Sequence, residues 1–189
     1  MGSLFCRPAT IPAKKALLWG LFWMLVGAIL AWYFSVVPTS VVGYTWGRTA
    51  LYKYVIFGVA IWVAVALPTL LLSMFRNRGV VVWELCGRML YAHIPATFVM
   101  VPAMFSDKIA FSTFMASPFG AQLPALYVAI MSIYMLLLMV WYLCWSYMAF
   151  KHQTQFSGWI SVMLFGIAEA ASYILSKYAI VELMNMGTI

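Results

Sequence analysis

The sequence has 189 residues, of which 66% are hydrophobic and only 8% carry a charge. This composition excludes a soluble globular protein and is typical of an integral membrane protein. The net charge of +7 comes from basic residues scattered singly between apolar runs, a pattern that argues against a nucleic-acid-binding surface.

Five long apolar runs predict an all-α fold, namely a polytopic membrane helical bundle with five transmembrane helices. About 20 consecutive apolar residues are needed for a helix to cross the hydrocarbon core of a bilayer. No stretch between the runs is long enough for a separate soluble domain, so residues 1–189 are predicted to form a single membrane domain. The predicted helices cover about residues 16–37, 54–75, 87–105, 123–150 and 157–182.

The first run follows the basic pair Lys14 and Lys15, as the apolar region of a signal peptide would. It is about 22 residues long, which exceeds a signal-peptide core, and no small-residue cleavage motif follows it. We therefore expect 16–37 to be a retained first transmembrane helix.

The third run, 87–105, is the least regular because it contains His93, Pro95 and Pro102. Proline removes a backbone hydrogen bond and bends a helix, so this helix is predicted to be bent. A re-entrant or strongly tilted element is the alternative. The polar connection 106–122 that follows contains apolar residues spaced as in a short amphipathic helix lying in the membrane interface.

The distribution of basic residues predicts the orientation in the membrane. Cytoplasmic flanks carry more lysine and arginine than external flanks. With the N-terminus inside and the C-terminus outside, seven basic residues face the cytoplasm and four face the exterior. The inner set is Arg7, Lys14, Lys15, Arg76, Arg78, Arg88 and Lys151, and the outer set is Arg48, Lys53, Lys108 and Lys177.

Glu169 lies near the middle of the last run, and none of the other four has a charged residue near its centre. An ionisable group at this depth is costly, so it faces a bundle interior or a wet cavity. It is either a proton or cation site or a hydrogen-bonded carboxyl that fixes helix packing, with Tyr173 or a group on the third helix as partner. The small residues around it predict that 157–182 lies at the centre of the bundle. His93 is the second candidate, either as a structural histidine or as a ligand or proton carrier.

A rim of basic residues is predicted on the cytoplasmic side. Such residues set topology and bind anionic lipid headgroups, and a docking surface for an acidic partner is the alternative. The rim consists of Lys14, Lys15, Arg76, Arg78 and Arg88.

No motif of an intramembrane protease occurs, and no second acid accompanies Glu169 near the centre of an apolar run, so the chain is predicted not to be an enzyme. The three cysteines, Cys6, Cys86 and Cys144, are widely spaced and form no zinc-site pattern. We expect no cofactor, no metal and no disulfide framework.

Three stretches carry a resemblance to a known family. They are Ala149-Phe150-Lys151-His152 with Phe156-Ser157-Gly158-Trp159, the small-residue helix 166–177 with Glu169, and 85–104 with Arg88, Ala92 and Pro95. Together with the five-helix layout, they resemble the Yip domain family, the Ypt/Rab-interacting membrane proteins and their bacterial relatives. The resemblance implies a five-helix bundle, and for the bacterial branch it implies a bacterial inner membrane.

Eukaryotic members of that family carry a long cytosolic N-terminal region and an acidic Asp-Leu-Tyr-Gly-Pro-type segment. Neither precedes the first helix of this sequence, so we do not expect this chain to bind a Rab protein. The predicted function is a non-catalytic membrane scaffold or adaptor that binds membrane lipids, partner membrane proteins or further copies of itself. The alternative is a small transporter or channel component that uses Glu169 as a proton or cation site.

Overall fold

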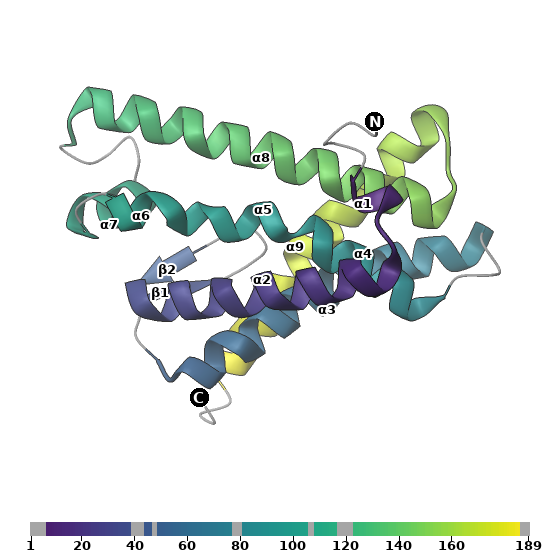
Figure 1. The fold of residues 1–189 in the computed structure, drawn as a ribbon, viewed down its shortest axis with the longest axis horizontal. Helices are drawn as coiled ribbons and strands as arrows, with labels where there is room; N and C mark the ends of the chain where they lie inside the picture. Colours follow the sequence, from purple (N-terminus) through teal and green to yellow (C-terminus); the bar gives the residue numbers. More distant parts are fainter. Residues whose placement is uncertain are drawn as a thin grey trace.

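The computed structural model describes residues 7–38, 44–46, 49–76, 81–105, 108–116 and 123–185. The described chain is helical except for two three-residue strands, which confirms the all-α class (Figure 1). The helices are α1 (Arg7–Thr10), α2 (Ala13–Phe34), α3 (Leu51–Arg76), α4 (Val82–Ala92), α5 (Ile94–Thr97), η2 (Phe98–Met100), α6 (Val101–Phe105), α7 (Lys108–Ala116), α8 (Ala125–Thr154) and α9 (Gly158–Asn185). The strands β1 (Val36–Pro38) and β2 (Tyr44–Trp46) pair antiparallel, with Val36 opposite Trp46.

Four helices, α2, α3, α8 and α9, are long and apolar enough to cross a membrane. They contain 22, 26, 30 and 28 residues. At a rise of about 1.5 Å per residue, each exceeds the thickness of the hydrocarbon core, which is about 30 Å. These helices make the chain an integral membrane protein, as its composition predicts.

The third predicted helix, 87–105, is not a single helix. The structure divides this region into α4, α5, η2 and α6, with a turn at His93 between α4 and α5. Pro95 lies in the first turn of α5, where its missing N–H is tolerated, and Pro102 lies in the short helix α6. The prolines therefore interrupt the helix as well as bending it, and none of the four pieces is long enough to span a bilayer by itself.

The closest helix packing joins α2 to α4, and glycine makes it possible. A Cβ atom added to Gly20 of α2 would lie 2.7 Å from Cγ of Leu90. One added to Gly87 of α4 would lie 3.1 Å from Cβ of Leu17. In a membrane, small residues let helix backbones approach closely, and α2 and α4 use them in this way.

The expectation that 157–182 lies at the centre of the bundle is wrong. The helix α9 packs chiefly along α3. Of the small residues that suggested a central position, Ala168 and Ser172 are buried, whereas Gly166 and Ala170 are exposed. No atom lies within 4 Å of a Cβ added to Gly166. Small side chains permit close packing but do not require it, and only one face of α9 is buried.

The segmented run from α4 to α6 lies between α2 and α8 in Figure 1. The helix α7, at the position predicted for a short amphipathic helix, packs its buried Phe111 and Phe114 into a second core cluster with Met131 of α8 and Val36 of β1. The short helices and the hairpin therefore fill the space between the long helices.

Candidate functional site

Glu169 of α9 is partly buried and accepts a hydrogen bond from a neighbouring helix. The hydroxyl of Tyr142, on α8, donates to Glu169 Oε2 over 3.0 Å. Tyr142 is itself 5% exposed. The two helices are joined by the short turn at 155–157, so their facing side chains can meet although they are 27 residues apart in sequence.

His93 is the second predicted site residue, and it reaches the same place from the turn between α4 and α5. Its ring meets the ring of Tyr142 edge to face, with the centroids 4.9 Å apart. Tyr142 thus contacts both predicted residues, and Glu169, Tyr142 and His93 form one polar group contributed by three parts of the chain. We call it the Glu169–Tyr142–His93 cluster.

The Nε2 atom of His93 is buried and has no hydrogen-bond partner among the described residues. Buried polar atoms are nearly always paired, so such an atom marks a place where a water molecule or a ligand could bind. A structural histidine would donate a hydrogen bond to a backbone carbonyl, and Nε2 of His93 makes no such bond to a described residue.

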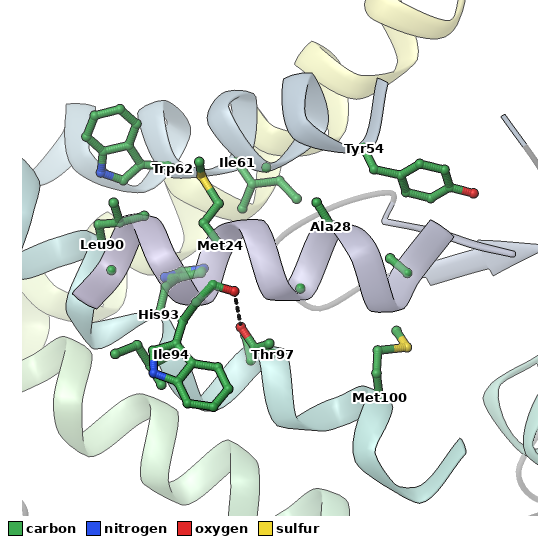
Figure 2. A pocket seen from close by; sticks show the side chains of 16 residues that line it. Met24, Ala28, Tyr54, Ile61, Trp62, Leu90, His93, Ile94, Thr97 and Met100 are labelled. Carbon is green, nitrogen blue, oxygen red and sulfur yellow. Dashed lines mark hydrogen bonds between the residues drawn. The ribbon is translucent and has the colours of Figure 1, made fainter. Parts of the chain in front are cut away.

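His93 also borders a cavity of about 110 Å³ between α2, α3 and the α4–α5 segment (Figure 2). The cavity wall is mostly apolar, with Met24, Ile61 and Leu90 among the lining residues. Thr97 adds a hydroxyl, but this group donates to the backbone carbonyl of Trp23 over 3.4 Å. The ionisable residues among those lining the cavity are His93 and Tyr54.

Tyr173, predicted as a partner of Glu169, lies one turn further along α9. Its side chain is 43% exposed, and the hydrogen bond to Glu169 comes from Tyr142 instead. A position one turn away on the same helix does not ensure contact, because the neighbouring helix α8 brings a closer hydroxyl. Tyr142 is one of several aromatic residues near the end of the fourth apolar run. Nothing in the sequence around it distinguishes it from its neighbours as the partner of Glu169.

The predicted basic rim is only partly a free surface. Lys14, Lys15 and Arg76 are exposed, and the guanidinium of Arg76 lies 5.3 Å from the ring centre of Phe156. Arg78 lies outside the described residues.

Arg88 does not belong to the rim, and this corrects the prediction. Its side chain is 8% exposed, and its Nη1 donates to the carbonyls of Pro8 over 2.9 Å and of Ala9 over 2.8 Å. An arginine inside a protein keeps its charge and needs several acceptors. The short helix α1 supplies two of them, and the Nε of Arg88 has none among the described residues. Arg88 therefore anchors α1 to α4, and its charge is not available to a headgroup.

Within the described ranges, no group of three or more histidine, cysteine or acidic residues is placed to hold a metal ion. Cys86 and Cys144 are free thiols, and Cys6 lies outside the described residues. Comparisons with protein-family models, with curated proteins and with solved structures found no match for this chain.

Proposed function

We propose that this chain is a non-catalytic membrane scaffold or adaptor that binds anionic lipids and partner membrane proteins or further copies of itself. One observation carries the proposal: three polar side chains donate hydrogen bonds that join one helix to another. The Tyr142 hydroxyl bonds to Glu169, the Trp62 indole to the carbonyl of Cys86, and the Tyr134 hydroxyl to the carbonyl of Phe98. These three donors are therefore used in packing between helices, as polar side chains commonly are in membrane bundles.

Exposed apolar faces are the second support. Large side chains on α8 and α9 point away from the rest of the chain, and in a membrane they would meet lipid tails or partner helices. Among them are Leu126, Ile133 and Leu137 of α8 and Trp159, Ile167 and Tyr178 of α9, each more than half exposed.

The finer architecture belongs to the same proposal. We propose that the α4–α6 segment crosses the membrane as an interrupted fifth span, with the N-terminus in the cytoplasm and the C-terminus outside a bacterial inner membrane, as in proteins of the Yip type. In Figure 1 this segment runs between α2 and α8 over much of their length, which supports a crossing. Exposed Lys14 and Lys15 near the start of α2 and Lys151 near the end of α8 suit a cytoplasmic side.

A transporter or channel component is the second candidate. It is favoured by the unpaired Nε2 of His93, which lies beside the Tyr142–Glu169 pair and borders the cavity. A proton or small cation could bind there if the cavity opened to water.

Flux measurements separate the two candidates. The purified chain is placed in proteoliposomes, and proton and cation flux is compared between the wild type, Glu169→Gln and His93→Phe. The scaffold proposal expects no flux above that of empty liposomes from any of the three proteins. A wild-type flux abolished by Glu169→Gln would overturn the scaffold proposal and establish the transport site.

A further inference from the structure

A second hollow lies on the other side of the α5 segment, between α2 and α8. It is a groove of about 570 Å³ that runs from the mouth formed by Thr10, Ile11 and Pro12 to Phe98 of η2. Residues of α2, of α8 and of the interrupted segment line it. The interrupted segment lies between α2 and α8 in Figure 1. We call it the aromatic groove.

Aromatic rings in mutual contact line the aromatic groove. Trp23 of α2 lies 5.1 Å from Phe98, Phe98 lies 5.6 Å from Trp141 of α8, and Trp141 lies 5.3 Å from Trp145. These contacts link α2 to α8 across the floor of the groove. Rings that pack against each other hold their positions, so the groove is a preformed apolar surface.

The groove has one charged lining residue, Lys15, and it stands at the same end as the mouth. Lys15, Trp19 and Trp23 follow each other at intervals of four residues, so they lie on one face of α2. At about 1.5 Å per residue, the lysine is about 12 Å along the helix axis from Trp23. The groove is therefore basic at its mouth and apolar along its length.

The chain leaves this ammonium group available. Lys15 is exposed, whereas the buried Arg88 donates its hydrogen bonds to the carbonyls of Pro8 and Ala9. The same contacts hold α1, and with it the mouth residues that follow, against α4. These contacts hold the mouth in place, and among the described residues that line the groove Lys15 carries the charge.

A molecule that suits this groove has an anionic head and a long apolar tail. We infer that the aromatic groove binds one anionic phospholipid, with its phosphate beside Lys15 and an acyl chain along Trp19, Trp23 and Trp141. The inference rests on the proposed function, because it identifies the class of lipid that the scaffold binds and the place where it binds. Lys14 and Lys15 lie at the end of α2 that is proposed to face the cytoplasm. Anionic lipid headgroups are present in the cytoplasmic leaflet and are attracted to basic residues there.

Lipid binding by matched variants tests the inference. The delipidated protein is titrated in detergent with phosphatidylglycerol or with phosphatidylcholine of the same acyl chains, and bound lipid is counted by native mass spectrometry. We expect one tightly bound phosphatidylglycerol per chain, and about fivefold weaker binding of that molecule to Lys15→Gln. Lys14→Gln is the matched control, since Lys14 is exposed at the neighbouring position and does not line the groove.

The acyl chain is located by tryptophan quenching with phosphatidylglycerol brominated along its chain. We expect Trp141→Phe to reduce the quenched emission at low lipid ratios more than Trp159→Phe, which removes a 73% exposed tryptophan of α9. Equal losses of lipid affinity in Lys15→Gln and Lys14→Gln would overturn the inference that the lipid binds in the groove, and so would equal losses of quenching in the two tryptophan variants. Either result would leave general lipid binding intact. No preference of the wild type for the anionic lipid would contradict the lipid part of the proposed function as well. A second copy of the chain bound instead of lipid, and lost in Lys15→Gln, would also overturn the inference.

Discussion

The hydroxyl of Tyr142 on α8 donates a hydrogen bond to Oε2 of Glu169 on α9 over 3.0 Å, and the ring of Tyr142 also contacts His93. A carboxyl group inside a membrane bundle is costly unless a partner satisfies it, and Tyr142 is that partner. The hydrogen bond also fixes the position of α8 against α9, whose packing otherwise involves few residues because α9 lies mainly along α3.

Removal of the Tyr142 hydroxyl should destabilise the bundle. We expect Tyr142→Phe to lower the free energy of unfolding by about 1 kcal/mol, because Glu169 loses its hydrogen-bond donor in a poorly solvated place. The measurement is reversible unfolding in mixed micelles. Tyr173→Phe, which removes a hydroxyl from a 43% exposed side chain of α9, is the control and should leave stability within about 0.5 kcal/mol of wild type. Equal stability of the two variants would show that the hydrogen bond contributes nothing.

The α2–α4 contact should not tolerate a methyl group. Gly20→Ala places a Cβ 2.7 Å from Cγ and 3.0 Å from the backbone carbonyl carbon of Leu90, so α4 must shift. We expect a loss of about 1–3 kcal/mol in the free energy of unfolding, as for other overpacked contacts. Gly166→Ala, which meets no neighbouring atom, should be neutral or more stable by up to about 1 kcal/mol. A Gly20→Ala protein as stable as Gly166→Ala would contradict the packing of α2 on α4.

Arg88 should control the order of the N-terminal segment. We expect Arg88→Met to increase the rate of amide hydrogen exchange in residues 9–11 by about tenfold or more, because hydrogen bonds from a charged group contribute roughly 1.5–3 kcal/mol. Exchange is followed by mass spectrometry of the N-terminal peptide. Lys14→Met removes a charge from an exposed position nearby and should leave the exchange unchanged. Similar exchange in both variants would mean that Arg88 does not hold α1.

Cysteine labelling distinguishes five membrane crossings from four. In a cysteine-free background, single cysteines replace Lys14, Lys53, Lys151 and Lys177, and intact cells are treated with an impermeant maleimide. Five crossings with the N-terminus inside predict labelling at positions 53 and 177 only. If the α4–α6 segment stays on one side, positions 53 and 151 should react instead. Labelling at position 14 would show that the N-terminus lies outside, opposite to the proposed orientation. Labelling in lysed cells is the control, because every position should then be accessible.

The sequence alone determined the class of protein and the positions of the long helices. Long apolar runs form helices in a membrane because each backbone group must find its hydrogen bond within the segment. The prolines at 95 and 102 likewise predicted where helix three would be irregular, since their effect on the backbone is local. The basic residues predicted an orientation that the labelling experiment will test.

Tertiary structure decided which polar residues meet. Tyr142 and Glu169 are 27 residues apart and Arg88 is 80 residues from Pro8, so no local pattern in the sequence pairs them. In a helix of a soluble protein the apolar face marks the buried side. Lipid tails are as apolar as a protein core, so each membrane helix here is apolar on every face and no face is marked as the buried one. For this reason the sequence could not show that Gly20 and Gly87 lie in a tight contact while Gly166 is exposed, or that Arg88 points inward while Lys15 stays free.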